Sequence, residues 1–235
     1  MQLSQSILIK TQKSIISFFF LSFITFAFQA YSYEKKYLHN LTKSPQRRYN
    51  ITASHSHKFV WFRVAKVCTR TILKILENNV IFSVNDYAVP YDSKNYEGYY
   101  KFAFVRNPWS RIVSCYCNKV LTKCHPAFEE CYDKDFAYFV DFINRIDVVN
   151  SDPHIKLQTR LIPIDEVDFI GRFETFEEDL NHVLNVLNLS NTPIGHKNFS
   201  KHEHYSIYYT ETTKNIIAKK YKADILAFGY QFEYE

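Results

Sequence analysis

Two short stretches of the chain combine basic residues with hydroxyl groups at spacings that suit the binding of an anion. One stretch contains Lys66, Thr69, Arg70 and Thr71, and the other contains Arg106, Arg111 and Ser114. Lysine and arginine supply positive charge, while hydroxyl groups and the N–H groups of a helix start donate hydrogen bonds to phosphate oxygens. The pattern indicates a site for a small anionic ligand such as a phosphate group. For either stretch taken alone, the alternative is a solvated charge beside a helix end.

The first stretch differs from the glycine-rich phosphate loop of nucleotide kinases. That loop has the pattern Gly-x-x-x-x-Gly-Lys-Ser/Thr, whereas no glycine precedes Gly98 in this chain. A phosphate loop at Lys66 must therefore form without glycine. It would bind through backbone N–H groups and through hydroxyl groups three and five residues after the lysine.

Each stretch follows a predicted strand and begins a predicted helix. Apolar and β-branched runs predict strands, and apolar residues at helical spacing predict helices. The predicted strands cover residues 59–64, 100–105 and 167–173, and the predicted helices cover 69–78, 108–119, 135–145, 175–187 and 212–228. Alternation of this kind predicts an α/β domain with a mainly parallel sheet. Ligands bind such sheets at the carboxyl ends of the strands, where both basic stretches are expected.

The N-terminal region contains an uncharged apolar segment at residues 15–30, IISFFFLSFITFAFQA, preceded by Lys10 and Lys13. The segment is slightly shorter than the ~20 residues of a spanning helix. It predicts a signal-anchor or a cleaved signal peptide, and a core helix fits less well because no amphipathic period is present. The predicted organisation is a targeting segment at 1–33, a polar stem or linker at 34–57 and a globular domain at 58–235.

Composition narrows the classes of function. The net charge of +5 is spread along the chain without a basic run longer than a pair, which argues against nucleic-acid binding. The five cysteines show no Cys-x-x-Cys spacing, so no metal site is predicted. Cys124 and Cys131 could pair in an oxidising compartment, which leaves the redox state open. Sequons at Asn40, Asn50, Asn188 and Asn198 fit a luminal domain, although a chain rich in asparagine also produces them by chance.

Five segments, in order, resemble the Golgi-type carbohydrate sulfotransferases of sulfotransferase family 2 and their bacterial relatives. Residues 62–71, FRVAKVCTRT, resemble the 5′-phosphosulfate loop of that family, and residues 104–116, FVRNPWSRIVSCY, resemble its 3′-phosphate motif F-V-R-x-P-x-x-R-x-x-S-x-Y. The other three segments are 152–158, 168–179 and 221–230. The resemblance covers about residues 58–232 and implies a P-loop-like domain of three layers, with helices on both faces of the sheet.

The resemblance implies transfer of a sulfuryl group from 3′-phosphoadenosine 5′-phosphosulfate to a carbohydrate hydroxyl, with no metal. Lys66 matches the lysine that stabilises the leaving phosphate, and Arg106 and Ser114 match the ligands of the 3′-phosphate. The phosphate loop is completed by Cys68, Thr69, Arg70 and Thr71.

Two residues of this loop depart from the small residues common in relatives. Cys68 is one, and the bulky Arg70 either adds a phosphate contact or crowds the site. A polar loop at 196–202 is expected over the nucleotide, with Lys201 in contact with it.

The acceptor hydroxyl requires a general base, and His154 is the first candidate because it lies in the segment that resembles the family's His-Trp-x-x-Gln sequence. Ile155 replaces the aromatic residue there, and the alternative is an ordinary loop histidine. Glu174 is the second candidate for the base, although Glu174 and Arg172 more readily stabilise a loop.

Two other functions remain open from the sequence. One is a non-catalytic relative that binds nucleotide or glycan, and the other is a P-loop kinase acting on a small molecule. The expected partners of a sulfotransferase would be a glycan acceptor and a membrane, but not nucleic acid. The expected location is a single-pass membrane protein facing the Golgi lumen in a eukaryote, or a secreted or membrane-associated protein in a bacterium. Basic residues flank the apolar segment on both sides, so its orientation is open.

Overall fold

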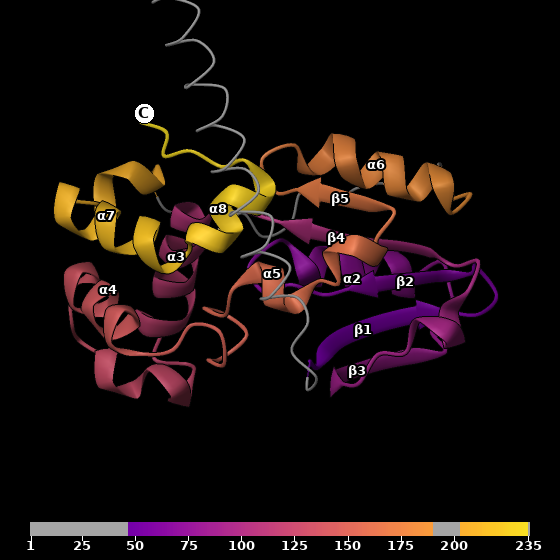
Figure 1. Ribbon diagram of the computed structural model, residues 1–235, viewed down its shortest axis with the longest axis horizontal. Helices are drawn as coiled ribbons and strands as arrows, with labels where there is room; N and C mark the ends of the chain where they lie inside the picture. Colours follow the sequence, from indigo (N-terminus) through magenta and orange to yellow (C-terminus); the bar gives the residue numbers. More distant parts are fainter. Residues whose placement is uncertain (1–46, 190–202, 235) are drawn as a thin grey trace, which may run out of the picture. The chain divides into compact units, whose positions relative to one another are not determined.

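The computed structural model describes residues 47–189 and 203–234 (Figure 1). The strands are β1 (Tyr49–Ser54), β2 (Phe59–Phe62), β3 (Val84–Val89), β4 (Tyr100–Val105) and β5 (Phe169–Arg172). The α-helices are α2 (Thr69–Glu77), α3 (Pro108–Cys115), α4 (Phe136–Arg145), α5 (Gln158–Leu161), α6 (Phe176–Val186), α7 (Glu211–Lys220) and α8 (Lys222–Phe228). Among these described residues, no helix combines the length and apolar character needed to cross a membrane. The expected targeting segment and Lys201 lie outside the described residues.

The five strands form one mixed sheet in the order β3-β1-β2-β4-β5. β4 pairs in parallel with β2 and β5, whereas β1 pairs antiparallel with β2 and β3. Four strands therefore run in one direction and β1 runs against them. All four residues of β2 are buried, as expected of a strand covered on both faces. The predicted α/β class and mainly parallel sheet are confirmed, with β1 as the exception.

The prediction of a stem or linker at 34–57 is wrong in part, because Tyr49–Ser54 form the strand β1 inside the sheet. The sequence YNITAS resembles a linker because it is polar, but the hydroxyl groups of Thr52 and Ser54 are paired on folding. Thr52 Oγ1 donates to Asn85 Oδ1 at 2.8 Å, and Ser54 Oγ donates to the carbonyl of Ile81 at 2.8 Å. Hydrogen bonds of this kind allow polar side chains to be buried. The folded domain therefore begins before residue 58.

The predicted helices are present, with two differences. The helix expected at 108–119 is α3 followed by a π-helical turn at Tyr116–Val120. The helix expected at 212–228 is divided into α7 and α8 at Tyr221, whose backbone leaves the helical region. Tyr221 is fully buried, and its hydroxyl donates to the carbonyl of Ile155 at 2.5 Å. The break therefore attaches the C-terminal helices to the loop that carries His154.

The sequence leaves open a disulfide between Cys124 and Cys131, and in the structure both side chains are free thiols. Cys131 is buried and Cys124 is exposed. Cys131 is the last residue of the short 3₁₀ helix Pro126–Cys131 and points into the core, whereas Cys124 precedes that helix and lies at the surface.

The two basic stretches leave the sheet at the same edge. β2 and β4 are parallel neighbours with Phe62 opposite Ala103, so the loops that follow them begin side by side. Figure 1 shows α3, α4 and α7 gathered beyond the ends of β4 and β5, while α6 lies beside β5. The core joins the strands to buried residues of α2 and α6. This arrangement positions the loops at the carboxyl ends of the strands, as the sequence predicts.

Candidate active site

The loop between β2 and α2 turns without glycine because two other residues adopt left-handed backbone conformations. Lys66 has a φ of 73° and Cys68 a φ of 61°. Each such residue costs about 1–2 kcal/mol relative to a right-handed conformation. The Thr69 hydroxyl closes the loop by donating to the carbonyl of Val64 at 2.5 Å. The amides of Thr69 and Arg70 are then left as donors in the first turn of α2, where intrahelical acceptors are lacking.

The amino group of Lys66 is held inside the pocket. Its Nζ donates to Asn118 Oδ1 at 2.9 Å, and no carboxylate of the described residues forms an ion pair with it. Burial lowers the pKa of Lys66 to about 8, and the neighbouring charge of Arg106 acts in the same direction. A ligand with negative charge would oppose both effects and stabilise the protonated form.

Arg106 follows β4 and is 5% exposed. Its Nε donates to Ser110 Oγ at 2.9 Å, its Nη1 donates to the carbonyl of Lys66 at 3.3 Å, and its guanidinium lies 3.7 Å from the ring centre of Phe173. Burial lowers the pKa of Arg106 to about 10, although the charge of Glu174 opposes the shift. The guanidinium is therefore desolvated and positioned beside Lys66 before any ligand binds.

The backbone of Arg106 is fixed by Gln158 at the start of α5. Gln158 Oε1 accepts the N–H of Arg106 at 2.9 Å, and its Nε2 donates to the Arg106 carbonyl at 2.8 Å. Gln158 is itself fully buried, and its N–H donates to Asp224 Oδ2 at 2.8 Å. The side chain of Gln158, from the segment 152–158, thus fixes the main chain of Arg106 in the segment 104–116.

Arg111, which the sequence places beside Arg106 as an anion-binding candidate, has a different task. It is 1% exposed, and its Nε donates to the carbonyl of Ala65 at 3.1 Å. Its Nη1 and Nη2 donate to the carbonyls of Lys156 and Pro153, both at 2.8 Å. Arg111 therefore connects the Lys66 loop to the His154 loop. Each nitrogen of its guanidinium already donates a hydrogen bond to a backbone carbonyl.

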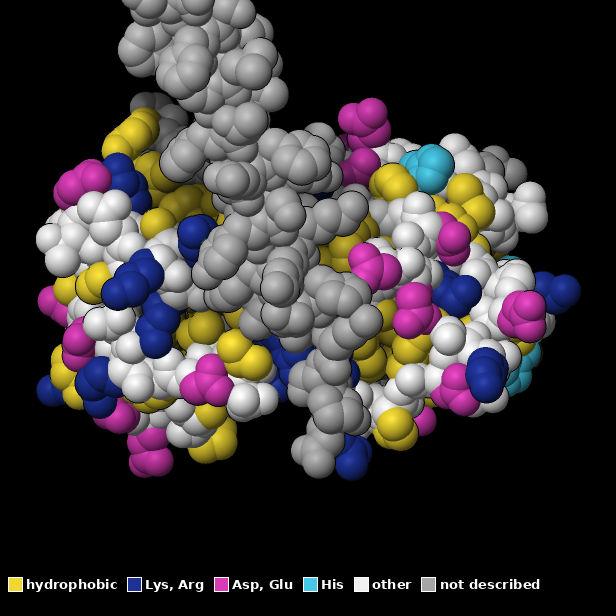
Figure 2. Space-filling view, in the orientation of Figure 1, with side chains coloured by type: hydrophobic (Ala, Val, Ile, Leu, Met, Phe, Trp, Pro, Cys, Tyr) yellow, Lys and Arg dark blue, Asp and Glu magenta, His cyan; other side chains and the backbone are white. Residues whose placement is uncertain are grey.

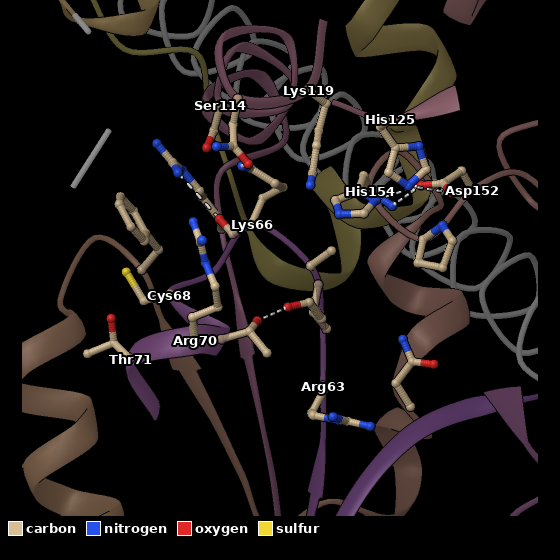
Figure 3. Close-up of a pocket in the computed structure, with 18 of the residues that line it drawn as sticks. Arg63, Lys66, Cys68, Arg70, Thr71, Ser114, Lys119, His125, Asp152 and His154 are labelled. Atoms are coloured by element: carbon tan, nitrogen blue, oxygen red, sulfur yellow. Dashed lines mark hydrogen bonds and ion pairs between the residues drawn. The ribbon is translucent and has the colours of Figure 1, made fainter. Parts of the chain in front are cut away.

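His154 lies at the other side of the pocket, next to a carboxylate (Figure 3). Asp152 Oδ1 accepts hydrogen bonds from the backbone N–H of His154 at 2.9 Å and from Nδ1 at 2.7 Å. Burial would raise the pKa of Asp152, but the bonds from His154 bring it below its ordinary value. Burial lowers the pKa of His154 below 6.5, and Asp152 opposes that shift. The imidazole is therefore neutral near pH 7, with its Nε2 able to accept a proton.

A second histidine shares the same carboxylate. Nε2 of His125 lies 3.6 Å from Asp152 Oδ2, and its Nδ1 is buried without a partner among the described residues. Candidate ligand atoms of His125, Asp152 and His154 lie within 4.8 Å of one another. These three residues form the group in the described part of the chain that could hold a metal ion. The short contact between Asp152 and His154 fits a proton-transfer pair.

These groups line one cavity of about 590 Å³. Its charged wall consists of one carboxylate, Asp152, and five cationic side chains: Arg63, Lys66, Arg70, Arg106 and Lys119. On the face shown in Figure 2, by contrast, basic and acidic side chains are interspersed without a continuous basic field. With five cationic side chains and one carboxylate in its wall, the pocket suits a small ligand with several negative charges.

The structure places eight of the expected site residues at this pocket: Lys66, Cys68, Thr69, Arg70, Thr71, Arg106, Ser114 and His154. Arg70 is exposed at its rim and does not crowd the loop. Glu174 lies at a neighbouring cavity instead, where it accepts hydrogen bonds from the N–H of Asn107 at 2.7 Å and from the hydroxyl of Tyr230 at 2.9 Å. Both its oxygens are engaged, which fits a structural role.

Several pocket residues were not singled out from the sequence: Asn50, Arg63, Tyr87, Asn118, Lys119 and His125. Asn118 could have been predicted as a pocket residue from the sequence, because it lies one helical turn after Ser114 and therefore on the same helix face. Arg63 directly follows β2, and Lys119 lies in the π-helical turn after α3. Asn50 of β1, Tyr87 of β3 and the loop residue His125 reach the pocket only through the tertiary fold.

Residues 49–231 match the profile of the sulfotransferase family. The rat and mouse (Rattus norvegicus and Mus musculus) proteins named carbohydrate sulfotransferase 11 are each 27% identical over 195 residues, covering 63% of this chain and 51% of theirs. An uncharacterised protein of Archaeoglobus fulgidus is 31% identical over 96 residues, covering 41% of this chain and 73% of its own. The chain spans about half the length of the rat and mouse relatives. No solved structure shows a significant match.

Proposed function

The chain belongs to the sulfotransferase family, and from this premise we propose that it transfers a sulfuryl group from 3′-phosphoadenosine 5′-phosphosulfate to a hydroxyl of a carbohydrate. The observation that carries the proposal is the convergence of Lys66, Arg106 and His154, from three separate segments, on one pocket. The carbohydrate sulfotransferases among its relatives support a glycan as the acceptor.

The pocket fits such a donor. Lys66 and Arg106 form no ion pair with a carboxylate of the described residues, so their charge is available to an anionic ligand. Arg106 and Ser114 would hold the 3′-phosphate, and the first turn of α2 from Thr69 would hold the 5′-phosphate. The donor would supply a sulfuryl group activated by its bond to that phosphate. Lys201 is proposed as a further contact from outside the described residues.

The side chains divide the chemistry between two ends of the pocket. Lys66 would stabilise the negative charge that grows on the phosphate oxygen as its bond to sulfur breaks. His154 would accept the proton of the acceptor hydroxyl at Nε2, because Asp152 keeps the other nitrogen protonated. Positioning and electrostatic stabilisation supply most of the rate enhancement in the related phosphoryl transfers, and these residues can provide both.

Incubation of the full chain with sulfur-labelled donor and a panel of glycans tests this function. We expect labelled glycan and nucleotide product in equal amounts, without added metal. A folded protein that binds no donor nucleotide would overturn the proposal. Donor binding without turnover, unaffected by His154→Ala, would identify a non-catalytic relative instead, and phosphate transfer from ATP dependent on Mg²⁺ would identify a kinase.

We also propose that the apolar segment at residues 15–30 either anchors the chain in a membrane or directs its export. The folded domain would then face the Golgi lumen in a eukaryote, or lie at the envelope of a bacterium. Fractionation of cells expressing the full chain or a chain lacking residues 1–33 tests this. The full chain should sediment with membranes or be exported, and the shortened chain should do neither. Equal behaviour of the two chains would contradict the proposal.

A further inference from the structure

Two histidines and one aspartate from separate segments meet at one side of the pocket. His125 directly precedes the 3₁₀ helix Pro126–Cys131, whereas Asp152 and His154 lie in the loop before α5. In Figure 3 the two imidazole rings and the carboxylate are turned toward one another. The ring centres of His125 and His154 are 4.8 Å apart, and candidate ligand atoms of all three residues lie within 4.8 Å of one another. Small side-chain rotations would bring the three groups onto one ion.

The main chain of His125 is fixed, whereas its ring nitrogens form no hydrogen bond within the described part of the chain. The hydroxyl of Tyr132 accepts the N–H of His125 at 3.0 Å and donates to its carbonyl at 2.8 Å. Nδ1 of His125 is buried without a partner among the described residues, and Nε2 lies 3.6 Å from Asp152 Oδ2, beyond ordinary hydrogen-bond distance. The ring can therefore turn toward a metal ion without breaking a hydrogen bond.

The chemistry of the three groups selects among metal ions. Two imidazoles and one carboxylate are ligands that zinc takes in open sites, at distances of about 2.0–2.2 Å and with water in the fourth position. Mg²⁺ and Ca²⁺ prefer several oxygen ligands instead. Asp152 is the one carboxylate among the described residues that line the pocket, and Lys66 and Lys119 line it too. The site therefore favours an ion that bonds to imidazole over one held mainly by negative charge.

We propose that His125, Asp152 and His154 form a zinc site whose occupation switches off the enzyme. The inhibitory part of this inference rests on the proposed sulfuryl transfer. His154 would bind zinc through Nδ1, the nitrogen that lies 2.7 Å from Asp152 Oδ1. As the zinc–nitrogen bond replaces a zinc-bound water, the proton of Nδ1 moves to Nε2 and the ring stays neutral. Nε2 then has no lone pair for the proton of the acceptor hydroxyl, so transfer stops.

The first test measures metal binding by the full chain, freed of metal with a chelator, without donor or acceptor. Titration calorimetry with Zn²⁺ should show one tight site per chain. His125→Ala should weaken binding there at least ~10-fold, because loss of even an outer partner of a metal ligand costs roughly 10- to 100-fold. Co²⁺ bound to the wild type should show the visible absorption of a four- or five-coordinate ion, and the variant should lose it. Unchanged Zn²⁺ affinity in His125→Ala overturns the proposal.

Three further variants control for folding and for the location of the ion. His125→Gln, a replacement of similar size, should also lose the site and guards against misfolding of the alanine variant. Cys124→Ser removes the exposed thiol next to His125, and His182→Ala removes a histidine packed on Phe169. Both should bind Zn²⁺ as the wild type does. Loss of the site in Cys124→Ser would assign the ion to the thiol and overturn the proposal.

The second test measures inhibition, with the chelator-treated form of each variant as its own reference. Saturating Zn²⁺ should lower the kcat of the wild type at least ~100-fold, the usual contribution of a general base, and chelator should restore it. His125→Ala should keep most of its own metal-free activity at the same Zn²⁺ concentration, and Mg²⁺ should not inhibit the wild type. Full activity of the zinc-loaded wild type overturns the proposal. If the metal-free wild type transfers no sulfuryl group but binds Zn²⁺ through His125, the proposed reaction has failed while the metal site stands.

Discussion

Nδ1 of His154 lies 2.7 Å from Oδ1 of Asp152, and this contact determines which nitrogen of the imidazole can act as a base. An ionised carboxylate can only accept a hydrogen bond, so Nδ1 carries the proton. The lone pair is then on Nε2. Since the same oxygen also accepts the backbone N–H of His154, the ring orientation is fixed together with the tautomer.

Replacing the base should abolish most of the turnover without affecting donor binding. His154→Ala is expected to lower kcat by at least ~100-fold, the usual contribution of a general base, while affinity for the donor nucleotide stays unchanged. Single-turnover assays and nucleotide binding measure the two effects. His182→Ala is the control, because His182 packs on Phe169 away from the pocket. A near-normal kcat in the His154 variant would contradict the assignment.

Replacing Asp152, the hydrogen-bond partner of His154, should change the pH dependence of activity. Burial lowers the pKa of His154, and Asp152 raises it. The base works in its neutral form, so activity falls as the pH drops through this pKa. Asp152→Asn removes the raising influence, and the acidic limb should move to lower pH while kcat declines. Asp141→Asn, in an exposed ion pair on α4, should leave the limb in place. Loss of activity without movement of the limb would indicate a purely structural role for Asp152.

Lys66 should make the free enzyme sensitive to alkaline pH. Its pKa is lowered to about 8 by burial, so its positive charge is lost as the pH rises through that value. The kcat/KM for the donor should decline above this pH, and Lys66→Arg should move the decline upward because arginine stays protonated. Lys66→Ala should lower kcat at least ~100-fold. Lys74→Ala, on the exposed side of α2, is the control. An unchanged alkaline limb in Lys66→Arg would refute this role.

Arg106 should distinguish nucleotides by their 3′-phosphate. Arg106→Ala removes a desolvated charged donor worth about 1.5–3 kcal/mol, or ~10- to 150-fold in affinity. The loss is expected for 3′-phosphoadenosine 5′-phosphate and not for adenosine 5′-phosphate, as titration calorimetry would measure. Arg145→Ala, in an exposed ion pair with Asp141, controls for net charge. Equal losses for the two nucleotides would place Arg106 elsewhere on the ligand.

Gln158 should affect stability more than chemistry. Gln158→Ala leaves both backbone groups of Arg106 buried and unpaired, at about 1–3 kcal/mol for each group. The free energy of unfolding, measured by urea denaturation, should fall by at least about 2 kcal/mol. Asn150→Ala in an exposed turn should change it by less than about 0.5 kcal/mol. A small effect in the Gln158 variant would show that the neighbouring chain rearranges to satisfy Arg106.

The elements around the two basic loops were predictable because their signals are local. The apolar runs of β2 and β4 and the proline at the start of α3 are readable without knowledge of the fold. β1 was not predictable in the same way. Its threonine and serine look like linker residues until Asn85 and the Ile81 carbonyl, about thirty residues away, provide hydrogen-bond partners.

Residue types and their order along the chain were sufficient to predict the α/β class, the family resemblance and the two basic loops that line one pocket. They also showed that any phosphate loop here does without glycine, which the left-handed conformations of Lys66 and Cys68 explain. Other features exist only in the folded chain. Arg111 and Arg63 are both arginines after a strand or at a helix start. Each guanidinium nitrogen of Arg111 donates to a carbonyl, whereas Nε and Nη1 of Arg63 are buried without a hydrogen-bond partner in the part of the chain that the structure describes. Burial and hydrogen-bond partners separate them, and both depend on segments far apart in the sequence.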